Sequence, residues 1–146
     1  LLIFESDAYS LLPGRRPDDL SSKEHNSVAL KHSTEEQQEE FDRGRIMKVL
    51  RTAEKALEEG LNNPKALAAD ATELISSATL VELMGRRLFT SDPDYGGDDA
   101  YLKQAEEMVN GARLLKVHAA KGDYEGIRTA LSGVKSSCVK CHARFR

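Results

Sequence analysis

Residues 123–146, DYEGIRTALSGVKSSCVKCHARFR, contain the clearest helical pattern in the chain. Apolar residues recur there at steps of three and four, the spacing that gathers side chains on one face of an α-helix. Asp123 can cap the start of this helix by accepting hydrogen bonds from free backbone amides. We therefore expect an amphipathic helix that continues to the end of the sequence. Its apolar positions are Ile127, Leu131, Val134, Cys138, Cys141 and Phe145.

Three further helices are expected upstream. The first covers 34–59 and stops at Gly60, because glycine commonly ends helices. It begins with a capping box, in which a hydroxyl and a longer polar side chain three residues later each satisfy a free backbone amide. The residues available for this box are Ser33, Thr34, Glu36 and Gln37.

The second and third helices are marked by capping residues and by a turn between them. An Asn-Pro pair at 63–64 begins the second helix, because proline is tolerated at the first helical position, and this helix ends near Gly85 or one turn later. The stretch 90–97 is dense in turn formers. One of the aspartates at 98–99 caps the third helix, and a Lys-Gly pair at 121–122 ends it.

Composition and connection lengths together predict an all-α fold. The 146 residues include no tryptophan, 5% aromatic residues and 40% hydrophobic residues, which is enough for one core. Four helices with short connections favour an antiparallel up-down-up-down four-helix bundle over 34–146. Residues 1–33 mix proline, glycine and serine without a sustained period, so we expect an irregular N-terminal extension.

Charge and hydropathy disfavour several functions. The formal net charge of −3 gives no general attraction to phosphate backbones, so we expect no nucleic-acid binding. No run approaches the ~20 apolar residues of a membrane-spanning helix, so we expect no transmembrane segment. No paired carboxylates or activated nucleophile stand out in the sequence, and enzymatic catalysis is therefore not expected.

The chemistry of the chain is concentrated in the run Cys138-Val139-Lys140-Cys141-His142, a C-x-x-C-H motif. This is the attachment sequence of c-type haem, in which both thiols bond to vinyl groups and the adjacent imidazole binds iron. On a helix, residues three and four apart share a face, so two sulfurs and one nitrogen meet a single flat ligand. We predict one covalent haem c on Cys138 and Cys141, with His142 as an axial ligand.

Three other interpretations of the two cysteines are open, and each has a defect. A structural zinc site needs four protein ligands, and the sequence has no second C-x-x-C and no H-x-x-x-H pair. Thioredoxin-like redox chemistry expects a βαβ context that the helical pattern lacks. A C-x-x-C beside an unrelated histidine would have no chemical role, and its loop is too short for a disulfide to stabilise the fold usefully.

The expected topology places the end of the last helix level with three further candidate residues, Met47, Met84 and Tyr101. Met47 is the candidate for a second axial ligand, since thioether ligation opposite histidine is established for c-type haem. The alternative is a packing role for Met47 and five-coordinate iron. His118 is expected roughly 25 Å or more from His142, at about 1.5 Å per residue, and is a poor second ligand.

The cations near the motif have two interpretations each. Arg43 shares a helical face with Met47 and is a candidate partner of a haem propionate, because guanidinium binds carboxylates at two points. The alternative is a solvated arginine. Three further cations complement the carbonyl end of the last helix, and they would also surround the haem edge and attract an acidic redox partner. These cations are Lys140, Arg144 and Arg146.

The C-terminal run SCVKCHARFR resembles the class II c-type cytochromes, the cytochrome c′ family, and the resemblance extends over 34–146. In that family the haem motif lies at the C-terminus, and the aromatic-basic pair that follows it corresponds here to Phe145-Arg146. An arginine followed four residues later by methionine or leucine on the first helix faces the distal side of the haem, and Arg43 with Met47 matches this pattern. The tryptophan often found early in the third helix is absent, and the nearest aromatic residue is a tyrosine.

The resemblance implies an electron carrier or a gas binder. The leading hypothesis is one-electron transfer, with Met47 completing the coordination of iron. The second is a five-coordinate protein that binds nitric oxide or carbon monoxide, with Met47 as an apolar wall. The third is a haem relay subunit that its extension over 1–33 ties to a larger redox complex. The resemblance also implies a periplasmic or other extracytoplasmic location, and it includes a homodimer among the expected states.

Overall fold

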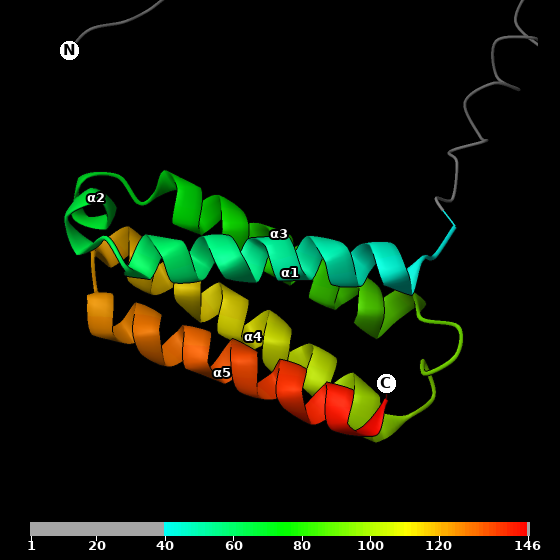
Figure 1. Ribbon diagram of the computed structural model, residues 1–146. Helices are drawn as coiled ribbons and strands as arrows, with labels where there is room; N and C mark the ends of the chain where they lie inside the picture. The colour runs from blue at the N-terminus through cyan, green and yellow to red at the C-terminus, as the bar shows by residue number, and fades with distance from the viewer. Residues whose placement is uncertain (1–39, 146) are drawn as a thin grey trace, which may run out of the picture. The chain divides into compact units, whose positions relative to one another are not determined.

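Residues 40–145 are the part of the chain that the computed structural model describes, and every regular element in them is an α-helix (Figure 1). The expected extension over 1–33, and the domain boundary after it, lie outside these residues. None of the described helices combines the length and the apolar character needed to cross a membrane. The elements are α1 (Arg43–Leu61), α2 (Pro64–Ala69), α3 (Thr72–Ser91), α4 (Asp99–Lys121) and α5 (Tyr124–Arg144).

The four long helices form an antiparallel bundle, which confirms the predicted fold class. Along the bundle α1, α3, α4 and α5 alternate in direction, and each packs against the next one in chain order (Figure 1). The first and last helices, α1 and α5, touch each other very little. The bundle is therefore tightly packed on three sides and loosely packed along the side formed by α1 and α5.

The core lies along the inner faces of the four long helices and is mostly aliphatic. Leu57 and Leu115 have no exposed surface, and each such side chain contributes roughly 1.5–3 kcal/mol by leaving water. The predicted apolar face of the last helix is confirmed. Its buried members are Ile127, Leu131, Val134 and Cys141, and its half-buried members are Cys138 and Phe145.

The predicted bounds of the first helix, 34–59, are wrong at both ends. Residues 40–42 are not helical, and α1 begins at Arg43 because the side chain of Asp42 accepts a hydrogen bond of 3.0 Å from the backbone amide of Arg45. An N-cap has non-helical backbone angles, so a helix that started at 34 could not continue through Asp42. At the other end, Gly60 lies inside α1 and does not stop it.

The predicted second helix is divided in two and ends later than expected. Asp70 has extended backbone angles, and its carboxylate accepts a hydrogen bond of 2.8 Å from the amide of Thr72, so α3 starts anew after the short α2. Gly85 was expected near the helix end but lies inside α3. A side chain at Gly85 would place its Cβ 2.9 Å from the Cγ2 of Val109, so this glycine allows α3 and α4 to approach closely.

The third and fourth predicted helices are confirmed, including the residues that cap them. Asp98 accepts hydrogen bonds from the amides of Ala100 and Tyr101 at the start of α4. Gly122 ends α4 in the left-handed conformation, with a φ of 66°. Asp123 begins α5 by accepting from the amide of Gly126 at 3.0 Å. Only local contacts are involved in these caps, which is why the sequence pattern located them.

Candidate cofactor site

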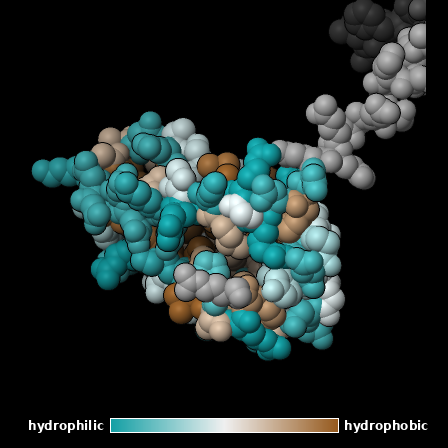
Figure 2. Space-filling model, turned by 45° about the vertical axis from the view of Figure 1, so that its right-hand side comes forward, coloured by the Kyte–Doolittle hydropathy of each residue, from teal (hydrophilic) through white to brown (hydrophobic). Residues whose placement is uncertain are grey.

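A cleft of about 680 Å³ opens between α1 and α5, where these two helices barely touch. Figure 2 shows a hollow in the surface of the bundle, with hydrophobic residues inside it and both hydrophilic and hydrophobic residues at its rim. All three residues of the predicted attachment motif, Cys138, Cys141 and His142, line the cleft from α5. The α1 wall is formed by Met47, Lys48, Leu50, Arg51 and Glu54.

The inner surface of the cleft is apolar and is built by all four long helices. Apart from Val139, which is exposed, its larger aliphatic and thioether side chains also belong to the core at this end of the bundle or pack against it. A flat hydrophobic ligand would be shielded from water there, and polar groups would contact it only at the rim. The apolar residues that line the cleft, besides Met47 and the two cysteines, are Leu50, Val81, Leu88, Met108, Val134, Val139 and Ala143.

The two thiols lie one turn apart on α5 and are not joined in a disulfide. Burial raises the pKa of Cys138 to about 11, and the nearby charge of Glu54 adds to this effect. Burial also raises the pKa of Cys141, with a further contribution from the carboxylate of Asp92. Both thiols are therefore protonated at neutral pH, unlike the low-pKa thiolate of a thioredoxin-like redox site.

The imidazole of His142 and the thioether of Met47 belong to opposite walls of the cleft. His142 is on α5 and exposed, and Met47 is on α1 and half-buried. The other methionine candidate, Met84, packs against the core from α3 but does not line the cleft. His118 lies in the last turn of α4, at the opposite end of the bundle from the motif, and its Nδ1 is 2.8 Å from a carboxylate oxygen of Asp123, the residue that caps α5.

Tyr101 and Phe145 meet at the same end of the bundle as the motif. Their rings are 5.2 Å apart and nearly perpendicular, and Tyr95 packs against both of them. The guanidinium of Arg144 lies over the Phe145 ring, 5.2 Å from its centroid. This aromatic cluster fixes the end of α5 against α4 and the loop before α4. The remaining predicted residue, Arg146, lies outside the described part of the chain.

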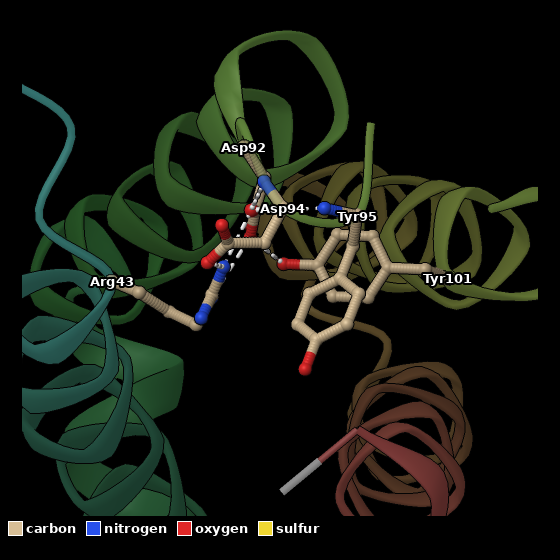
Figure 3. Close-up of polar contacts among 5 residues, drawn as sticks. All are labelled: Arg43, Asp92, Asp94, Tyr95 and Tyr101. Carbon is tan, nitrogen blue, oxygen red and sulfur yellow. Dashed lines mark hydrogen bonds and ion pairs between the residues drawn. The ribbon is translucent and has the colours of Figure 1, made fainter. Parts of the chain in front are cut away.

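Arg43 is held by two carboxylates at the start of α1. Its guanidinium donates two hydrogen bonds to Asp92, at 2.9 and 2.6 Å, and one to Asp94 at 2.8 Å (Figure 3). It also lies over the ring of Tyr95, 4.7 Å from the centroid. The hydrogen bond to Asp92 is the main reason that the pKa of Arg43 is raised. Arg43 does not line the cleft.

Asp92 is a structural residue that the sequence did not reveal. Its side chain is completely buried, and its carboxylate also accepts a hydrogen bond of 2.6 Å from the hydroxyl of Tyr101. The backbone amides of Asp94 and Tyr95 donate to the same carboxylate. In the sequence, Asp92 was one of several turn formers at 90–97, and the local pattern contains nothing to distinguish a buried aspartate from an exposed one.

The donors and the shape of the cleft fit a covalently attached haem. Two thiols and one imidazole share one wall, an apolar interior lies in front of them, and a volume of about 680 Å³ falls within the range of cofactor pockets. Residues 40–145 contain no group of three His, Cys, Asp or Glu side chains placed to hold a metal ion. The donor set in the cleft is thus that of a porphyrin site, not of a zinc site built from protein ligands.

A four-helix bundle with a C-x-x-C-H motif on the wall of an apolar cleft defines the class of helical c-type cytochromes. The sequence model of the cytochrome C′ family matches residues 39–146, and the chain belongs to that family. No curated protein and no solved structure matches the chain.

Membership of this family establishes the general function. The protein is a monohaem c-type cytochrome with a covalently attached haem c, and proteins of this family are generally electron carriers or gas binders. Members of the family are typically periplasmic and are often homodimers.

Proposed function

We propose that the protein is a one-electron carrier in which Cys138 and Cys141 attach the haem and His142 is an axial ligand of its iron. The support is that all three side chains line one wall of an apolar cleft, in the order that the attachment motif requires. The bound haem supplies an iron centre that gains and loses one electron. The role of α5 is to hold two sulfurs and one nitrogen on the same face of a single rigid helix.

Met47 is proposed as the second axial ligand. The observation that carries this proposal is that Met47 and His142 line the same cleft from opposite helices, α1 and α5. Thioether ligation opposite histidine raises the potential of c-type haem and suits an electron carrier. The aliphatic neighbours of Met47 in the cleft, among them Leu50 and Val81, keep water away from this side.

Gas binding is the second candidate function. The apolar lining of the cleft and the partial burial of Met47 suit a small neutral molecule, such as carbon monoxide or nitric oxide, on the α1 side. In that case Met47 contributes only an apolar wall, and the iron has His142 as its single protein ligand. The two candidates differ in whether the sulfur of Met47 binds iron.

The visible spectrum of the holoprotein tests the assignment of Met47. For an electron carrier we expect a low-spin ferric spectrum with the far-red charge-transfer band of methionine ligation, and Met47→Leu should abolish this band and give a high-spin spectrum. Met84→Leu is the matched control, because Met84 is a half-buried methionine outside the cleft. A wild-type protein that is already high-spin and takes up carbon monoxide readily would establish the gas binder instead.

The mass of the intact chain tests haem attachment. We expect wild-type protein to carry the mass of one haem that acidified organic solvent does not extract, because both thiols form covalent bonds. Replacing Cys138 and Cys141 together by serine should remove this mass. A wild-type chain without added mass would contradict the attachment.

The cellular setting is proposed on chemical grounds. Haem attachment of this type is made outside the cytoplasm, and we therefore place the protein in the periplasm or another extracytoplasmic compartment. The acidic redox partner expected from the cations Lys140 and Arg144, and a larger complex bound through 1–33, stay predictions. In the structure, Lys140 lies 3.9 Å from Glu107 and Arg144 lies 3.8 Å from Asp98, so both cations already have an acidic neighbour.

A further inference from the structure

Two cations on the α1 wall of the cleft have no partner within the described residues. Lys48 and Arg51 line the cleft one turn apart, and their side chains form no hydrogen bond or ion pair inside residues 40–145. Both are exposed, so their charges stand at the rim and not in the apolar interior. Lys48 directly follows the proposed ligand Met47 on α1, and Arg51 is four residues after Met47.

The other cations near this end of the bundle are already engaged. Arg43, the residue expected to bind a haem propionate, is bound to Asp92 and Asp94 and does not line the cleft. Lys135 lines the cleft from α5 but is paired with Glu58 of α1. Lys48 and Arg51 are therefore the unpaired cations that the described part of the cleft offers to an anionic ligand.

The chemistry of haem determines where its anionic groups would be. The vinyl groups and the two propionates occupy opposite edges of the macrocycle, so the propionate edge faces away from the sulfurs that bind the vinyl edge. Glu54 lies beyond Arg51 along α1, and its charge acts on Cys138 at the sulfur side of the cleft. Glu54 thus acts at the sulfur side of the cleft, and Lys48 and Arg51, which have no partner within residues 40–145, line the cleft six and three residues earlier on α1.

We propose that Lys48 and Arg51 bind the haem propionates, and that Arg43 does not. This inference rests on the proposed function, because it requires haem attached at Cys138 and Cys141. Guanidinium and ammonium groups both pair well with carboxylates, and the planar guanidinium of Arg51 can bind one at two points. Lys48 and Arg51 are positioning residues, because they contact the periphery of the cofactor and not its iron.

The test measures how fast the propionates of the holoprotein react with a carbodiimide and an amine. The reaction is followed by the increase in mass of the peptide that carries the haem. Propionates paired with cations are held ionised and react slowly. The double variant Lys48→Gln/Arg51→Gln should react about fivefold faster than wild type, the factor that corresponds to losing an exposed ion pair of ~1 kcal/mol. The reduction potential should also fall, because removing positive charge near the haem favours ferric iron.

Two control variants make the result specific. Lys55→Gln removes one positive charge from the outer face of α1, where the Lys55 side chain is 76% exposed, and should change neither the reaction rate nor the potential appreciably. Arg43→Gln should leave the reaction rate of the propionates unchanged. An unchanged rate in the double variant, or an increase in Arg43→Gln alone, would overturn the inference. If wild-type protein carries no covalent haem, the proposed function fails first, and the mass spectrum shows this before any modification.

Discussion

Outside the cleft, Asp92 is the single residue whose environment matters most for the stability of the fold. Burial alone would raise the pKa of its carboxyl, but the hydrogen bonds from Arg43, Tyr101 and two backbone amides outweigh burial and lower the pKa to about 2. The same contacts join the start of α1 to the end of α3 and to α4 (Figure 3). A removed or protonated carboxylate would leave a guanidinium and a buried hydroxyl without their main partner.

The low pKa of Asp92 predicts acid sensitivity of the fold. A carboxyl whose pKa is 3.8 when unfolded and about 2 when folded stabilises the protein by about 2 kcal/mol at neutral pH. This contribution is present above pH ~4 and is lost as the pH falls toward 2, because the unfolded chain binds the proton first. Urea unfolding between pH 2 and 7 should show the decline in wild type.

The variant Asp92→Asn isolates this effect from other carboxylates. It should be less stable than wild type by about 2 kcal/mol at pH 7, and the difference should shrink toward pH 2. Asp99→Asn, at an exposed aspartate in the first turn of α4, is the control and should cost far less. A stability difference between Asp92→Asn and wild type that does not change with pH would contradict the role of ionised Asp92.

At the scale of helices, the effect of a glycine on stability depends on its backbone conformation, and two glycines illustrate this. Gly122 ends α4 with a φ of 66°, a conformation that costs a residue with a side chain about 1–2 kcal/mol. Gly133 lies in the middle of α5, exposed, and a Cβ there would meet no atom within 4 Å. A glycine in such a position weakens a helix by ~1 kcal/mol relative to alanine.

We therefore predict opposite effects of the same substitution at these two sites. Gly122→Ala should lower the free energy of unfolding by about 1 kcal/mol, because alanine is strained in the left-handed conformation. Gly133→Ala should raise it by ~1 kcal/mol. Chemical denaturation of the holoproteins measures both, and effects of equal sign would show that the backbone conformation does not control them.

At the scale of the whole molecule, the cleft is the consequence of an incomplete ring of helices. α3 packs against α1 and α4, and α4 packs against α5, but α1 and α5 are joined weakly. Two polar links connect them: the pair of Lys135 with Glu58, and a hydrogen bond of 2.8 Å from the hydroxyl of Tyr124 to the carbonyl of Leu61. A cofactor between α1 and α5 would complete the packing on the fourth side.

Loss of the cofactor should accordingly loosen α1 first. In the double variant Cys138→Ser/Cys141→Ser, amide hydrogen exchange should accelerate more in 46–57 of α1 than in 108–119 of α4, because α1 keeps only α3 as a close neighbour. Holoprotein of wild-type sequence is the reference. Equal acceleration in both segments would show that the haem stabilises the bundle uniformly.

Much of this molecule was predictable where the interactions are local. The spacing of apolar residues predicted the four long helices, and the caps at Asp98, Gly122 and Asp123 were located because a cap involves residues at most four apart. Two of the errors in helix bounds, at Asp42 and Asp70, also concern single capping aspartates. Several polar residues near each helix end could serve as caps, and the backbone angles decide between them.

By itself the sequence determined the chemistry of α5, because the spacing of Cys138, Cys141 and His142 places them on one helical face whatever the rest of the chain does. The tertiary structure alone decided what lies opposite that face. Arg43 and Asp92 are 49 residues apart in the sequence, and their pairing holds Arg43 outside the cleft. The cations that line the α1 wall of the cleft are Lys48 and Arg51. Such contacts depend on how helices are placed in space, and no local pattern encodes that placement.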